Sequence, residues 1–112
     1  SDSSDGVASG HISPDFGSKV FYYTVPLRVG VILVDSTLGD VAVMLPDASL
    51  FKKRSLFIKD MVGLSNTSGA GQIFIVPPQG QTLDSYTYDT PYPLQPWASR
   101  QCYSNGISWF LI

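Results

Sequence analysis

The sequence predicts an all-β fold, an antiparallel two-sheet sandwich of the jelly-roll type. No window of ten or more residues shows the 3.6-residue period of an amphipathic helix. The acidic residues are nine Asp and no Glu, and Asp favours turns over helices. The chain also contains ten Gly and eight Pro, which indicates many turns between short strands.

The expected strands are runs of β-branched and aromatic residues that end at Pro, Gly or clusters of polar residues. In chain order these runs cover residues 20–25, 28–34, 40–45, 55–59 and 72–76, followed by short extended pieces at 82–83 and 86–88. Three Pro between residues 91 and 96 predict an irregular or edge segment before the last strands.

Two local signals predict turns within this pattern. Asp47 is expected to cap a single helical turn over residues 47–51, because Asp is a preferred helix N-cap. Asn105-Gly106 is the pair that favours positive φ in a tight hairpin turn. We therefore expect the chain to close with a hairpin whose arms are residues 99–103 and 107–112.

The domain organisation is expected to be simple. Residues 1–18 begin with small polar residues and predict a flexible N-terminal linker, whereas residues 19–112 fit a single sandwich domain. The chain begins with Ser rather than Met, which suggests a fragment of a longer protein.

Several expected strands are apolar at both odd and even positions, which is unusual for a water-exposed sandwich. Residues 41–45, 56–58 and 73–76 show this pattern, whereas a sheet with one wet face alternates apolar and polar residues. A second sheet covers one face, and without helices we expect neighbouring subunits to cover the other. We therefore predict an obligate homo-oligomer whose interface includes Val41, Val43, Phe57 and Phe74.

The sequence offers little for catalysis or for cofactors. Its only histidine, His11, lies in the expected linker, and no cluster of Cys, His or carboxylates has metal-ligand spacing. The net charge of −2 lacks a basic stripe for nucleic acid, and no apolar stretch is long enough to insert into a membrane. We expect no enzyme activity, metal or cofactor, and a buried, unreactive Cys102.

Aromatic residues near the C-terminal end are the one positive signal. Tyr and Trp are favoured at binding surfaces because they combine a large rigid area with a polar group. Two interpretations remain open, packing at a subunit interface or contact with a ligand such as a host glycan or protein receptor. The candidate ligand-binding residues are Tyr86, Tyr88, Tyr92 and Trp97.

Over residues 30–112 the order of the segments resembles a β-structured domain of tail fibres, head fibres and other surface appendages of phages and large DNA viruses. The segments that carry the resemblance are VILVD (31–35), GDVAVMLPDA (39–48), RSLFIKD (54–60), IFIVP (73–77), GQTLD (80–84), YT (86–87), TPY (90–92) and SNGISWFLI (104–112). Residues 93–100 depart from the pattern, because Pro93 and Pro96 interrupt an expected strand.

This resemblance implies a homotrimer on the virion surface, at or near the tip of a fibre, and it supplies no catalytic motif. The leading hypothesis is a fibre or spike head domain that trimerises and attaches the virion to a host cell through exposed loops and aromatic residues. A second hypothesis is a purely structural trimerisation or capping module without a ligand. A third is a carbohydrate-active enzyme that would use Asp84 or Asp89.

Overall fold

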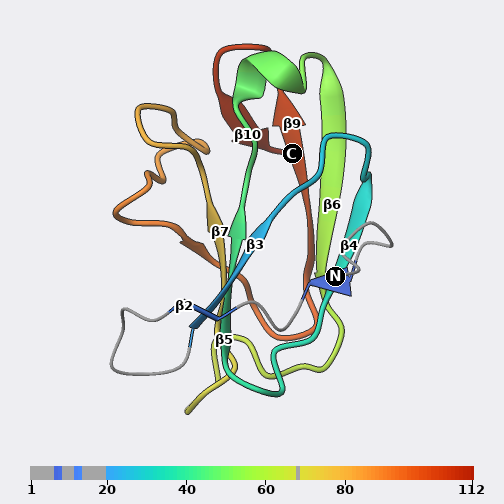
Figure 1. Ribbon diagram of the computed structural model, residues 1–112, viewed down its shortest axis with the longest axis vertical. Helices are drawn as coiled ribbons and strands as arrows, with labels where there is room; N and C mark the ends of the chain where they lie inside the picture. Colours follow the sequence, from blue (N-terminus) through green and yellow to red (C-terminus); the bar gives the residue numbers. More distant parts are fainter. Residues whose placement is uncertain (1–6, 9–11, 14–19, 68) are drawn as a thin grey trace.

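The computed structural model describes residues 7–8, 12–13, 20–67 and 69–112, and their strands form two five-stranded sheets (Figure 1). In spatial order, sheet A contains β1 (Val7–Ala8), β4 (Val31–Val34), β6 (Arg54–Asp60), β9 (Ser99–Ser104) and β10 (Trp109–Leu111). Sheet B contains β2 (Ile12–Ser13), β3 (Val20–Thr24), β5 (Asp40–Met44), β7 (Ile73–Val76) and β8 (Tyr92–Pro93). In the described ranges the only helical piece is the 3₁₀ turn η2 (Ala48–Leu50). The expected all-β class is therefore confirmed.

The prediction that the sheets are antiparallel was wrong, because both sheets are mixed, and a jelly-roll arrangement is not confirmed. From β3 to β7 each strand lies in the sheet opposite to the strand before it, so the chain crosses the core at every step. Neighbours within a sheet then run in the same direction, and the pairs β3–β5, β5–β7 and β4–β6 are parallel. Parallel pairing requires a crossover connection, which is usually a helix. Here the crossover is a strand of the other sheet, so no helix is needed.

Antiparallel pairing occupies the β6–β9–β10 half of sheet A and the two edges of sheet B, whereas β1 pairs in parallel with β4. β6–β9 and β9–β10 are antiparallel in sheet A, as are β2–β3 and β7–β8 in sheet B. The predicted final hairpin is confirmed as β9–β10, although its loop contains the four residues 105–108 and only Gly106 has a positive φ. Asn105 instead uses its side-chain oxygen to accept the N–H groups of Ile107 and Ser108.

The core lies between the sheets and is closed at one end by η2. Asp47 caps this turn as predicted, with its carboxylate accepting the Ser49 N–H at 2.9 Å. Behind the cap, Phe51 packs on Trp109 with ring centroids 5.3 Å apart. The largest fully buried side chains are Trp109, Phe51, Ile32, Leu56, Ile58, Ile73, Ile75, Leu83 and Leu94.

Two parts of the predicted N-terminal linker are strands. Val7–Ala8 pairs in parallel with β4, and Ile12–Ser13 pairs with β3, so these residues extend both sheets at their edges. The flexible linker predicted over residues 1–18 is therefore not continuous, because a sheet edge supplies free backbone groups to which a polar segment can pair. The rest of that segment, including His11, lies outside the described residues.

The strand faces correct the predicted subunit interface. Val41 and Val43 are 1% and 0% exposed and point into the core of the same protomer, so no second subunit can reach them. The apolar pattern of β5 was correctly recognised, but it does not distinguish the core face from the outer face. Phe57 and Phe74 lie on the outer faces of sheet A and sheet B, and their assignment to an interface stays a prediction.

Candidate functional site

The loop between β7 and β8, residues 77–91, carries the residues that form the candidate site. Leu83 anchors the loop, because its side chain is fully buried and its backbone is bridged to Tyr86 and Trp109. The Asp84 carboxylate accepts the N–H of Leu111 at 3.2 Å, which ties the loop to β10. The Asp84 side chain therefore already has a structural contact, which weakens its case as a catalytic acid.

Gln81 anchors the first part of the same loop to the cap of η2. Its side-chain oxygen accepts the Ala48 N–H at 3.0 Å, and its amide nitrogen donates to the Asp47 carboxylate at 3.0 Å. The Ser49 backbone N–H, followed by the Gln81 amide and the Ser49 hydroxyl, lowers the pKa of Asp47. The carboxylate therefore stays charged, which maintains the cap and the loop anchor together.

Beyond this anchor, a tight turn presents Tyr88 and Asp89. Thr87 and Thr90 exchange both backbone hydrogen bonds at 3.2 Å, and their hydroxyls lie 2.8 Å apart. Two residues enclosed by such a pair have little backbone freedom. Tyr88, which is 40% exposed, and the exposed Asp89 therefore occupy a rigid tip.

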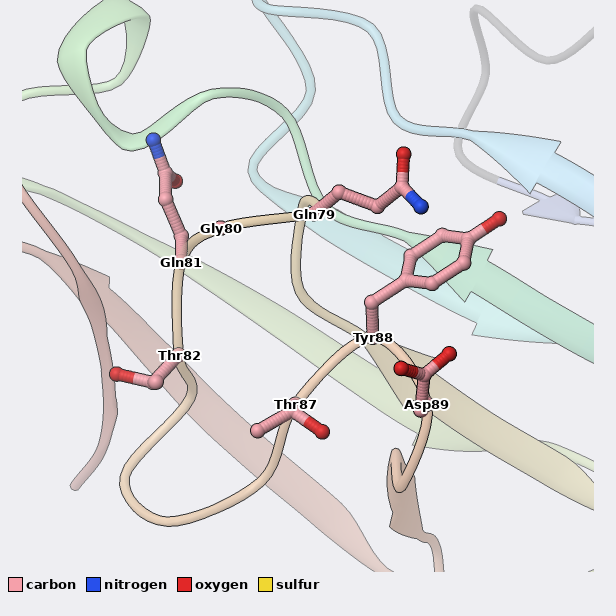
Figure 2. Close-up of a pocket in the computed structure, with 7 residues that line it drawn as sticks. All are labelled: Gln79, Gly80, Gln81, Thr82, Thr87, Tyr88 and Asp89. Carbon is pink, nitrogen blue, oxygen red and sulfur yellow. The ribbon is translucent and has the colours of Figure 1, made fainter.

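Two hollows meet at this tip. The first has a volume of about 340 Å³ and is lined mostly by polar residues; Figure 2 shows its lining residues Gln79, Gly80, Gln81, Thr82, Thr87, Tyr88 and Asp89. The second has a volume of about 350 Å³ and lies over the outer face of sheet B. It is lined by Val20, Tyr22, Ala42, Met44, Phe74, Val76, Tyr88, Asp89 and Pro91. Because Tyr88 and Asp89 belong to both linings, the hollows form one composite groove, which we call the Tyr88 groove.

Of the four aromatic residues predicted to bind a ligand, only Tyr88 lines this groove. Tyr86 and Tyr92 pack edge to face, with ring centroids 5.1 Å apart, and both contact the core. The Arg100 guanidinium donates to the Tyr92 hydroxyl at 2.6 Å and lies 5.1 Å from its ring centroid. These contacts give Tyr86 and Tyr92 a packing role within the protomer.

Trp97 belongs to a different region, in the loop between β8 and β9. Its side chain is 58% exposed and its ring lies against Gly63, where an added Cβ would come within 2.3 Å of the indole. The Lys59 ammonium lies 5.7 Å from the ring centroid and also donates to the Trp97 carbonyl oxygen. The structure therefore does not bring Trp97 into the Tyr88 groove.

Asp60 connects the loop between β6 and β7 to the loop between β8 and β9, which contains Trp97. Its carboxylate is buried and accepts the backbone N–H groups of Val62, Gly63, Ser65 and Trp97 at 2.9–3.2 Å. Burial disfavours the charged form, but the four N–H groups outweigh it and lower the pKa of Asp60. This arrangement satisfies every carboxylate oxygen internally, so Asp60 is a structural connector between the loops.

Neither metal binding nor thiol chemistry finds support among the described residues. No group of three or more His, Cys or Asp side chains in that part of the chain is placed to hold a metal ion. Burial raises the pKa of the Cys102 thiol to about 12, so the neutral, unreactive form dominates at physiological pH. No described helix is long and apolar enough to cross a membrane.

A second surface feature is the outer face of sheet A, which is largely apolar. Val31 on β4 pairs with Phe57 on β6, and these side chains are 55% and 39% exposed. Across the same face, Tyr103 on β9 pairs with Phe110 on β10, and Phe110 is also exposed. Ser55 and Gln101 lie between the two pairs and are hydrogen-bonded to each other at 2.9 Å. An apolar face that spans four strands is typical of an interaction surface.

Sequence reasoning missed most of the Tyr88 groove. Gln79, Tyr22 and the small Ala42 come together only when the 77–91 loop meets the outer face of sheet B. The sequence contains one weak signal, the Thr87-Tyr88-Asp89-Thr90 segment, in which two Thr bracket an aromatic and an acid. In comparisons with known proteins, no family model, curated protein or solved structure matches this chain.

Proposed function

We propose that this domain is the head of a virion fibre or spike, which assembles as a homotrimer and attaches the virion to its host. It is a binding module without catalytic activity. The observation that carries the assembly half is the apolar outer face of sheet A, with Val31, Leu33, Phe57 and Phe110 exposed in one protomer. Covering such a face with other copies removes it from water, which is the main driving force of association.

The attachment half is supported by a concave, preorganised surface away from that face. The Tyr88 groove combines an aromatic ring with free polar side chains on an anchored loop. Loops held on a rigid scaffold are the usual position for binding residues. The trimeric state and the location on the virion rest on the sequence resemblance. The apolar face adds support for assembly, and the groove adds support for attachment.

The test of assembly is the mass of the protein in solution. Sedimentation velocity at micromolar concentration is expected to give a trimer for the wild type and a monomer for Phe57→Lys. The lysine would bury an unpaired charge, which costs more than about 2 kcal/mol at each interface and weakens association at least ~30-fold.

Leu38→Lys is the matched control, because Leu38 is an exposed apolar residue in the turn before β5 and not on the sheet A face. It is expected to remain a trimer. A wild-type protein that stays monomeric across the micromolar range would refute the assembly proposal.

The test of attachment is the binding of labelled trimer to panels of bacterial and eukaryotic cells. Retained trimerisation without binding to any cell would favour the purely structural module.

A further inference from the structure

We propose that the Tyr88 groove binds a neutral saccharide. This inference rests on the attachment half of the proposed function and specifies its ligand class. The two hollows, at about 340 and 350 Å³, each match the small end of ligand pockets, which span roughly 300–1,000 Å³. Together they provide room for one or two sugar rings on either side of Tyr88.

Free polar groups gather on one side of the loop. Among the described residues, the side chains of Gln79, Tyr88 and Asp89 have no hydrogen-bond partner, and all three extend toward the same side in Figure 2. Gln81 points the other way, toward its anchor at η2. An amide, a phenol and a carboxylate supply donors and acceptors for the paired hydroxyls of a sugar ring.

The second hollow supplies the apolar contact that such a ring also needs. Its floor on sheet B contains Ala42, Phe74 and Val76, and the Tyr88 ring stands at its edge. Sugar rings carry C–H groups on one face and hydroxyls around the rim, so they fit an apolar floor bordered by polar groups. Aromatic rings are especially suited to the C–H face.

The charge of the groove determines which sugars fit. Among the residues that the structure describes, no Lys, Arg or His lines either hollow, and Asp89 is the only charged lining residue. A carboxylate without a neighbouring cation repels phosphate, sulfate and carboxylate groups. We therefore expect neutral hexoses and N-acetylhexosamines to bind, and sialylated or sulfated sugars to be excluded.

The site is also preorganised, which reduces the entropic cost of binding. The Thr87–Thr90 hydrogen bonds hold the tip, and Gln81 and Asp84 anchor the first half of the loop to η2 and to β10. Monovalent affinity in a shallow groove of this size is expected to be weak, with a Kd on the order of 1 mM.

The experiment is an NMR titration of the ¹⁵N-labelled wild-type protein. The probes are the methyl glycosides of glucose, galactose, mannose and N-acetylglucosamine, with methyl N-acetylneuraminic acid as the anionic comparison. At least one neutral glycoside is expected to shift amide signals of residues 79–91 and of β3, β5 and β7, and the anionic one is not.

Four variants locate the interaction. Tyr88→Ala is expected to raise the Kd about tenfold, whereas Tyr88→Phe, which keeps the ring, changes it by less than ~3-fold. Asp89→Asn keeps the shape of the tip but is expected to weaken binding severalfold. Trp97→Ala is the control, since Trp97 is an exposed aromatic outside the groove, and it is expected to leave the Kd unchanged.

The outcomes separate this inference from the proposed function. Cell binding that persists in Tyr88→Ala, with no glycoside shifting the groove, would overturn the saccharide inference and leave attachment standing. Loss of the trimer in Tyr88→Ala would also overturn it, because the groove would then be occupied by a second copy. Glycoside shifts in a wild type that stays monomeric would support the inference and refute the assembly proposal.

Discussion

Trp109→Ala is the most direct test of the fold, because Trp109 links the hairpin, the 77–91 loop and η2. Its side chain is fully buried, its ring packs on Phe51, and its indole N–H donates to the Pro46 carbonyl at 2.9 Å. Its backbone N–H donates to the Thr82 carbonyl at 2.9 Å. Removing the indole therefore creates a cavity where three parts of the chain meet.

The magnitude follows from these contacts. Deleting a buried aromatic side chain costs about 3–5 kcal/mol, and leaving the Pro46 carbonyl without its donor adds ~1 kcal/mol. For 112 residues the total stability is on the order of 6–17 kcal/mol, so the variant loses a large share of it. Trp109→Phe keeps a ring against Phe51 but loses the hydrogen bond, and is expected to cost about 1–2 kcal/mol.

Urea unfolding, monitored by far-UV circular dichroism, measures the loss in free energy of unfolding. It does not depend on indole fluorescence, to which Trp97 would contribute. With an m-value of ~1.5 kcal/mol per molar urea, Trp109→Ala lowers the midpoint by about 3 M. The series is measured at several protein concentrations, because self-association would add a concentration-dependent term. A midpoint within ~0.5 M of the wild type would show that Trp109 does not lie in a packed core.

Two further predictions concern the loop junction at the Trp97 end. Asp60→Asn leaves the N–H groups of Ser65 and Trp97 without a carboxylate acceptor and is expected to cost about 2–4 kcal/mol at pH 7. Because the folded pKa of Asp60 lies below 3.8, the stabilisation is complete well above that pH and disappears as the pH falls through the lowered value. The urea midpoints of wild type and variant should therefore converge as the pH falls through the lowered pKa of Asp60, and a constant difference would contradict the role of the charge. Gly63→Ala should displace the Trp97 indole and cost more than Gly80→Ala, since both glycines have positive φ but only Gly63 lies against a side chain. Equal midpoints for these two variants would refute the Gly63–Trp97 contact.

The strands from β3 to β7, the η2 cap and the final hairpin were predictable because they depend on local chemistry. Runs such as residues 73–76 are β-branched and aromatic, Asp47 is a standard cap, and Asn105-Gly106 favours a turn. The strand directions were not predictable. A turn sequence that leads into an antiparallel partner resembles one that leads across the core into the opposite sheet.

The face assignment failed for a related reason. In β5 both faces are apolar, so Val41 and Ala42 carry equivalent signals although one points into the core and the other outward. Ala42 is nevertheless only 5% exposed, because larger neighbours on the same face and the tip of the 77–91 loop shield it. The sequence argument considered only subunits as a cover for the second face. A short loop of the same chain provides part of that cover.

The outer faces of the two sheets differ in how much of each is covered. For this reason we assign the proposed assembly to one face and the proposed ligand binding to the other. The outer face of sheet B is partly covered by the 77–91 loop and hollowed into the Tyr88 groove, whereas the outer face of sheet A exposes Val31 and Phe57. The two outer faces point in opposite directions, because the sheets pack through their inner faces (Figure 1). An assembly built on sheet A therefore leaves each Tyr88 groove facing outward. Several linked sites would raise the apparent affinity by about 10²–10⁴, so the proposed binding near 1 mM at each groove would be sufficient for the proposed attachment.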